Sequence, residues 1–114
     1  MKFDKALISG SNAMLLLSLL QDGDKYGYEM VQELKRRSND AFELKEGTLY
    51  PLLHSLEKSG EIRAYDATAI SGRVRRYYHL TDKGAARLSE KVTEWRAFSE
   101  SVNAVLGPAV LAGA

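Results

Sequence analysis

Three arginines stand within four residues, at Arg73, Arg75 and Arg76, and form the strongest local basic cluster of the chain. A guanidinium group is always charged in proteins and binds phosphate through a planar fork of N–H donors. Such a cluster suits neutralisation of nucleic-acid phosphates, or insertion of a guanidinium into a narrow minor groove. A run of solvated surface arginines would have the same composition. The helices and strands that position these residues therefore decide between the two interpretations.

Side chains for catalysis or metal binding are sparse. The sequence has no cysteine, and its two histidines, His54 and His79, lie far apart with no metalloprotease spacing. Nucleophile-elbow, phosphate-loop and dinucleotide-binding glycine motifs are also absent. We therefore expect no enzyme, no metal site and no cofactor.

Size and composition indicate one ordered domain. The chain has 114 residues, of which 45% are hydrophobic and 27% charged, with a net charge of +1. A core this small favours association with a second subunit, and a charge so near balance neither requires nor excludes nucleic acid. The absence of cysteine and of long apolar runs predicts a soluble, cytoplasmic protein.

The spacing of apolar residues predicts three helices before any strand. The first spans residues 3–20 with an interruption at Gly10, and the second spans residues 26–37, with Tyr26 on its apolar side. The third begins near Glu46 and stops at Gly60. Its apolar stripe comprises Leu49, Leu52, Leu53 and Leu56. Its opposite face presents Gly47, Pro51, His54 and Lys58, flanked by Tyr50 and Ser55.

A hairpin and a long helix follow. Strand-like segments at 61–65 and 75–80 are joined by a loop with Ser71-Gly72 at its turn, which places the three arginines near the tip. Thr81-Asp82 then caps a helix that runs to Leu106, where Gly107-Pro108 is predicted to stop it, a length of roughly 39 Å.

One face of this last helix repeats every three or four residues like the seam of a coiled coil. The seam comprises Leu88, Val92, Trp95, Ser99, Val102 and Leu106. A helix this long extends beyond so small a core, and its seam predicts a homodimer with Leu88, Val92, Trp95, Val102 and Leu106 at the interface. The expected fold is mainly α with a small β-hairpin: a winged helix-turn-helix over residues 1–80 and a dimerisation helix over 81–107.

Four segments in this order resemble the PadR family of transcription regulators. They are Tyr26-Gly27-Tyr28-Glu29-Met30, the run from Glu46 to Leu53, the run from Leu56 to Ile62, and the run from Gly72 to Thr81 followed by Gly84. The resemblance is close from about Leu15 to Gly84 and looser in the last helix. It implies a dimeric repressor that binds double-stranded operator DNA.

The resemblance, together with the exposed face of the third helix, gives a set of candidate DNA contacts. Tyr28 matches a family tyrosine that reaches the DNA backbone, Gly47 permits close approach to a phosphate, and the Thr48 hydroxyl can donate to one. His54, Ser55 and Lys58 fit base or phosphate contacts and a solvated face equally well. The full set is Tyr28, Gly47, Thr48, Tyr50, Pro51, His54, Ser55, Lys58, Arg73, Arg75 and Arg76.

Trp95 carries a second hypothesis. The sequence is similar to the small branch of the family that includes multidrug-sensing repressors, where a tryptophan lines a flat pocket at the dimer centre. An indole beside its symmetry mate would hold a planar aromatic or cationic effector, while plain dimer packing is the alternative. The predicted ligand site comprises Trp95, Phe98, Ser99 and Val102, with Ile8 and Asn12 as walls.

A winged helix that binds another protein instead of DNA is the main alternative, because the fold serves both uses. Salt separates the two, since DNA affinity falls linearly with the logarithm of salt concentration and an apolar interface is nearly indifferent.

Overall fold

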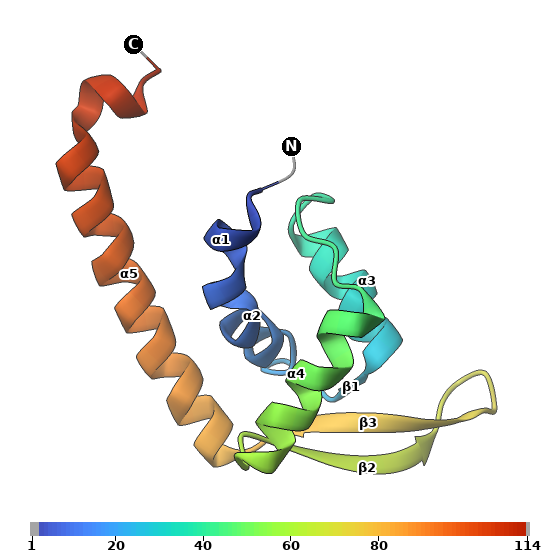
Figure 1. Cartoon of the computed structure of the whole chain (residues 1–114). Coiled ribbons are helices and arrows are strands. Elements are labelled where there is room, and N and C mark those ends of the chain that lie inside the picture. Colours follow the sequence, from blue (N-terminus) through green and yellow to red (C-terminus); the bar gives the residue numbers. More distant parts are fainter. Residues whose placement is uncertain (1–2, 114) are drawn as a thin grey trace.

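The computed structural model describes residues 3–113. The elements in chain order are α1 (Lys5–Ile8), η1 (Ser9–Ser11), α2 (Asn12–Leu19), β1 (Lys25–Tyr26), α3 (Gly27–Arg37), α4 (Glu46–Lys58), β2 (Ile62–Thr68), β3 (Val74–Leu80) and α5 (Asp82–Leu111). The order confirms a winged helix-turn-helix followed by a long helix (Figure 1).

The N-terminal segment is helical but broken, as its glycine predicts. Asp4 caps α1 by accepting a hydrogen bond from the Ala6 N–H at 2.9 Å. A 3₁₀ turn containing Gly10 then separates α1 from α2. The leucines of α2 supply the centre of the core, with Leu16 and Leu17 fully buried.

The turn between α3 and α4 uses residues suited to unusual backbone geometry. The Ser38 hydroxyl donates to the Leu34 carbonyl at 2.7 Å and accepts from the Phe42 N–H at 3.0 Å. Asn39 and Asp40 then adopt φ values of 51° and 64°, in the left-handed region that these two residue types tolerate. Ser38, Asn39 and Asp40 therefore form the turn that follows α3.

Helix α4 begins at Glu46 as predicted, with Pro51 in its second turn. Leu49, Leu53 and Leu56 are buried, and Leu52 packs at the edge of the core. Gly60, with a φ of 80°, ends the helix in a Schellman turn, in which its N–H donates to the Glu57 carbonyl and the Glu61 N–H donates to the Leu56 carbonyl.

The sheet has three strands where two were predicted. The order is β1-β3-β2, all antiparallel, and the hairpin strands reach Thr68 and Val74, closer to the tip than expected. Strand β1 was missed because two residues are too few to show an alternating pattern. Tyr26, expected in the core, instead lies at the sheet edge opposite Tyr77.

Helix α5 is anchored at its start. The Thr81 hydroxyl accepts a hydrogen bond from the Gly84 N–H at 3.1 Å, which confirms the predicted N-cap. Gly84 is buried, and a Cβ atom there would lie 2.0 Å from the Glu61 carbonyl oxygen. Only glycine therefore allows α5 to approach the start of β2 so closely.

The far end of α5 differs from its prediction. Gly107 interrupts the helix with a φ of 80° and a ψ of 159°, as its type suggests. The chain then re-enters helical geometry up to Leu111, because proline fits the first turn of a new helical segment. The glycine-proline pair therefore bends the element and does not end it (Figure 1).

The core lies between α2, α3, α4, the sheet and the first turns of α5. Beyond these turns α5 projects away from the body, and the wing formed by β2 and β3 extends on the opposite side of the molecule (Figure 1). The two projections give the chain an extent of 54 Å along its longest axis, against 29 and 23 Å along the others.

Candidate nucleic-acid interface

The outward face of α4 carries the side chains predicted to meet DNA. Every one of these α4 residues is exposed: Gly47, Thr48, Tyr50, Pro51, His54, Ser55 and Lys58. A Cβ built at Gly47 has no neighbouring atom within 4 Å. A methyl group at this position would therefore meet no other part of this chain. With glycine at this position, the backbone of α4 is open to the outside.

The Tyr50 ring of α4 packs against Gly27 at the start of α3, next to Tyr28. A Cβ at Gly27 would lie 2.8 Å from the Tyr50 hydroxyl, so Gly27 makes room for that ring. The Tyr28 side chain is 64% exposed and that of Tyr50 is 48% exposed. Two tyrosine side chains from different helices thus stand on the surface beside the exposed face of α4.

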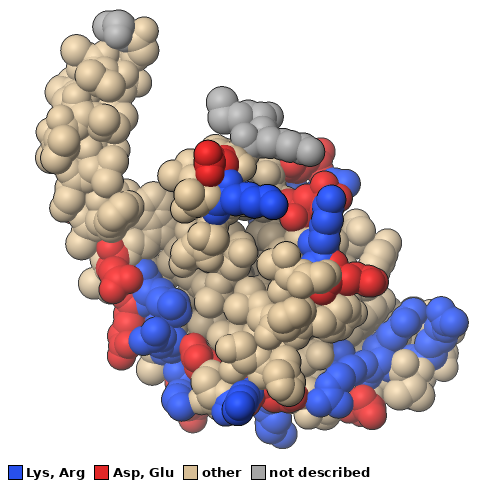
Figure 2. Space-filling model, viewed as in Figure 1, with Lys and Arg blue, Asp and Glu red and all other residues tan. Residues whose placement is uncertain are grey.

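The wing arginines are not one cluster on the tip. Arg73 is exposed in the turn before β3, whereas Arg75 and Arg76 lie within β3 and so point to opposite faces of the sheet. Figure 2 shows Lys and Arg atoms gathered along the wing side of the molecule.

Glu57 joins α4 to the wing, a contact that was not predicted from the sequence. Its carboxylate accepts a hydrogen bond from Arg76 at 3.1 Å and raises the pKa of that guanidinium. Both groups are partly exposed, so the pair contributes at most about 1 kcal/mol. The pair links the wing to α4.

A second missed contact lies on the other face of the sheet, at the residue before β1. The Asp24 carboxylate accepts hydrogen bonds from the Tyr65 hydroxyl at 2.5 Å and pairs with His79 Nδ1 at 2.8 Å. Burial alone would raise the pKa of Asp24, but the bonds from Tyr65 and His79 outweigh it and lower that pKa. The hydrogen bond from Tyr65 to Asp24 also raises the pKa of Tyr65.

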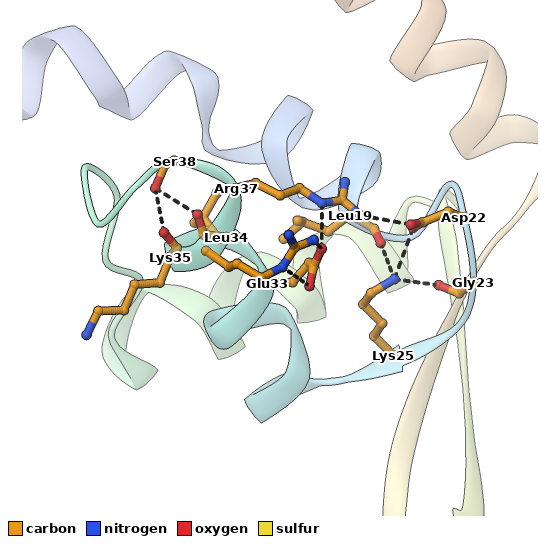
Figure 3. A network of polar contacts seen from close by, with 10 residues as sticks. Leu19, Asp22, Gly23, Lys25, Glu33, Leu34, Lys35, Arg37 and Ser38 are labelled. Atoms are coloured by element: carbon orange, nitrogen blue, oxygen red, sulfur yellow. Dashed lines mark hydrogen bonds and ion pairs between the residues drawn. The ribbon is translucent and has the colours of Figure 1, made fainter.

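Helix α3 is held to the loop before β1 by a chain of charges (Figure 3). Lys25 Nζ donates to the Leu19 carbonyl at 2.7 Å and pairs with Asp22 at 3.1 Å. Arg37 bridges Asp22 at 2.9 Å and Glu33 at 2.8 Å. Hydrogen bonds from Arg36 and Arg37 lower the pKa of Glu33 to about 2.

The predicted ligand site is only partly assembled. A groove of about 600 Å³ between the N-terminal helices and α5 is lined by Ile8, Trp95 and Phe98. Asn12, Ser99 and Val102 do not line it, because they lie on neighbouring faces of their helices. The groove is also lined by residues that were not predicted from the sequence, namely Phe3, Leu7, Ser11, Leu15, Phe42, Lys91 and Glu94.

The predicted dimer seam divides into an inner and an outer part. Leu88 is only 4% exposed and belongs to the core of its own chain, because the first turns of α5 pack on α2. Val92 packs partly against that core as well. The prediction of Leu88 as an interface residue is therefore wrong for this chain, while Trp95, Val102 and Leu106 are between 39% and 49% exposed.

Two other kinds of site are absent from residues 3–113. No group of three or more His, Asp or Glu side chains in this range is placed to hold a metal ion. Within the same range, none of the helices has the length and hydropathy needed to cross a membrane.

Comparison with known proteins agrees with this arrangement. A family model described as the transcriptional regulator PadR-like family matches residues 16–90. An uncharacterized protein of Lysinibacillus sphaericus is 40% identical over 97 residues, which cover 85% of this chain and 89% of the relative. A transcriptional regulator of Mycobacterium tuberculosis is 37% identical over 86 residues, covering 75% of this chain and 74% of the relative.

Solved structures show the same fold. A transcriptional regulator from Clostridium thermocellum superposes with a TM-score of 0.82 at 31% identity, over 90% of this chain and 99% of the other. The likeness therefore extends beyond the winged helix-turn-helix and includes most of α5.

Proposed function

The chain belongs to the PadR-like family of transcriptional regulators, and we propose that it represses transcription by binding operator DNA as a homodimer. As a transcriptional regulator it is not an enzyme. The observation that supports the DNA-binding proposal is the combination of an exposed, polar α4 face with a cationic wing, which the Arg76–Glu57 pair links.

In this proposal α4 is the recognition helix. Gly47 lets a phosphate approach the backbone, and the Thr48 and Tyr50 hydroxyls donate to phosphate oxygens near the positive end of the helix. Tyr28 extends the same contact from α3. Further along α4, Pro51 faces the major groove of the DNA. His54, Ser55 and Lys58 reach base edges or the opposite DNA strand.

The wing follows the DNA backbone beside the recognition helix. Arg73 is exposed at the tip and suits a phosphate or a narrow minor groove. Arg75 adds charge closer to the body, where the neighbouring Arg76 is paired with Glu57. Each phosphate neutralised makes binding more sensitive to salt, because condensed counterions are released.

The outer part of α5 supplies the dimer interface. Between Ala97 and Gly113 the sequence carries only one charged residue, Glu100. Figure 2 shows this end of the helix without Lys or Arg atoms. Val102, Val105 and Leu106 are exposed there beside Phe98. Burying such a surface against a second copy removes apolar area from water and places two recognition helices on one operator.

The groove beside Trp95 is the proposed effector site. Trp95 and Phe98 offer aromatic faces, which suit a planar aromatic or cationic ligand, and Lys91 and Glu94 place one charge of each sign among the lining residues. A ligand that binds best to a dimer geometry unable to span two half-sites, roughly 34 Å apart, would release the operator.

Fluorescence anisotropy tests the DNA proposal. The purified chain is titrated against a duplex from the region upstream of its own gene and against a random duplex, over a series of salt concentrations. We expect the upstream duplex to bind at least about 10³-fold more tightly and the affinity to fall with salt. Weak, unselective binding would favour a protein partner instead.

The effector proposal has a separate test. Trp95 is the only tryptophan, so its fluorescence reports on the groove directly. Tetraphenylphosphonium, an aromatic cation that does not intercalate into DNA, should quench it and weaken operator binding. Quenching without any change in operator affinity would show that the cation binds beside Trp95, but it would refute the proposal that such binding releases the operator.

A further inference from the structure

Three tyrosines form a ladder across the outer face of the sheet. Tyr77 of β3 stands directly opposite Tyr26 of β1 on one side and Tyr65 of β2 on the other. The rings of Tyr65 and Tyr77 stack at 5.8 Å, and those of Tyr77 and Tyr26 meet edge to face at 5.5 Å. The ladder joins the hairpin to the short strand that precedes α3.

Arg75 lies at the β1 end of this ladder. Its guanidinium carbon is 5.4 Å from the centre of the Tyr26 ring, within the range of a cation–π interaction. Its Nε is buried and has no hydrogen-bond partner in the described part of the chain. The stem and Nε of Arg75 are thus packed, and its terminal NH₂ groups remain for an outside partner.

The two arginines of β3 are held in different ways. Arg76 is paired with the Glu57 carboxylate, which fixes its position but offsets its charge. A tyrosine ring attracts a guanidinium through its quadrupole and carries no net charge. The ring therefore orders Arg75 while leaving its whole positive charge and its terminal donors available to an anion.

Tyr26 also connects this cation to α3. It is the N-cap residue of that helix, and its N–H donates to Glu29 Oε1 at 3.1 Å. Gly27 and the exposed Tyr28 follow immediately. The residue that holds Arg75 is therefore fixed at the start of the helix whose Tyr28 is proposed to meet the DNA backbone.

We propose that Tyr26 is a positioning residue for DNA binding, which holds the Arg75 guanidinium beside the start of α3 so that it meets a backbone phosphate already ordered. The inference rests on the proposed DNA-binding function. Ordering a long side chain in advance reduces the rotamer entropy lost on binding.

A double-mutant cycle tests the inference with the upstream and random duplexes. Tyr26→Leu should weaken binding roughly two- to fivefold, as expected for loss of a cation–π contact. Tyr26→Phe keeps the ring and should bind like the wild type. Arg75→Ala should weaken binding in the wild-type background, and by roughly two- to fivefold less in the Tyr26→Leu background.

Tyr65→Leu is the matched control, because it removes a ring of the same ladder that does not contact Arg75. Its effect and that of Arg75→Ala should be additive. Thermal melts of each variant establish that the fold is retained, and Tyr26→Ile, whose β-branched side chain suits a strand, takes the place of Tyr26→Leu in the cycle if that variant unfolds.

The outcomes separate the two proposals. If the wild type does not bind DNA, the proposed function fails. If it binds, but the effects of Tyr26→Leu and Arg75→Ala are additive or Tyr26→Phe is as weak as Tyr26→Leu, the positioning role of Tyr26 is overturned.

Discussion

The two projections of this molecule are built from opposite kinds of surface. The wing concentrates arginines on a short sheet tied to α4 through Arg76 and Glu57, whereas the outer part of α5 is almost uncharged and presents valine, leucine and phenylalanine. A polyanion is recognised by charge and hydrogen bonds, and a second copy of a helix by buried apolar area. One small chain thus separates its two proposed partners by surface chemistry.

Gly84 is where the two regions join, and its substitution should have the largest effect. In Gly84→Ala the new methyl group meets the Glu61 carbonyl oxygen, and we expect a loss of at least about 3 kcal/mol in the free energy of unfolding. Urea titration followed by circular dichroism measures it. Gly10→Ala, whose Cβ meets no atom within 4 Å, is the control and should be nearly neutral.

Charges placed in the outer part of α5 should break the proposed dimer. Val102→Asp with Leu106→Asp would bury unpaired carboxylates, and we expect dimerisation to weaken at least a hundredfold, by about 3 kcal/mol or more. Analytical ultracentrifugation measures the change. Asn103→Asp adds a charge to another face of the same exposed segment and should leave association intact. If Asn103→Asp weakened association as much as the double change, the assignment of Val102 and Leu106 to the dimer interface would be refuted.

Gly47→Ala should separate folding from binding. Because the new methyl group meets open space within a helix, we expect the free energy of unfolding to rise by up to about 1 kcal/mol. DNA affinity should fall about tenfold, as expected when one hydrogen bond from the backbone to a phosphate is lost. Melts and anisotropy titrations measure the two quantities, and unchanged affinity would place Gly47 outside the contact.

The smallest expected effect is a pH dependence of stability at Glu33, which lies in neither the wing nor the outer part of α5. The pKa of Glu33 is lowered from 4.5 to about 2, so the stabilisation it contributes is fully present above pH 4.5 and is lost as the pH falls towards 2. Melting temperatures of wild type and Glu33→Gln should therefore converge over this range. A constant difference between them would contradict the assignment.

The sequence predicted the elements with strong local signals and missed those that depend on distant partners. The helices, the Thr81 cap and the stop at Gly60 follow from periodicity and capping preferences. Strand β1 forms only because β3 lies beside it, so its two residues carry no pattern of their own.

The same distinction applies to the site. The exposed α4 residues were predictable from one helical face. By contrast, the Glu57–Arg76 pair and the Asp24–His79 pair join residues 19 and 55 positions apart. Leu88 fits the heptad spacing as well as Val102 does, and only the packing of α2 shows that it belongs to the core.

The salt dependence of DNA binding in two charge-matched variants tests the central claim most directly. Arg73→Ala removes a cation from the wing, and Arg96→Ala removes one from an exposed position of α5. The slope of log affinity against log salt is negative. We predict that Arg73→Ala reduces its magnitude by about 0.9, the value for one phosphate contact, while Arg96→Ala leaves it unchanged. Equal slopes in the two variants would contradict the assignment of DNA binding to the wing.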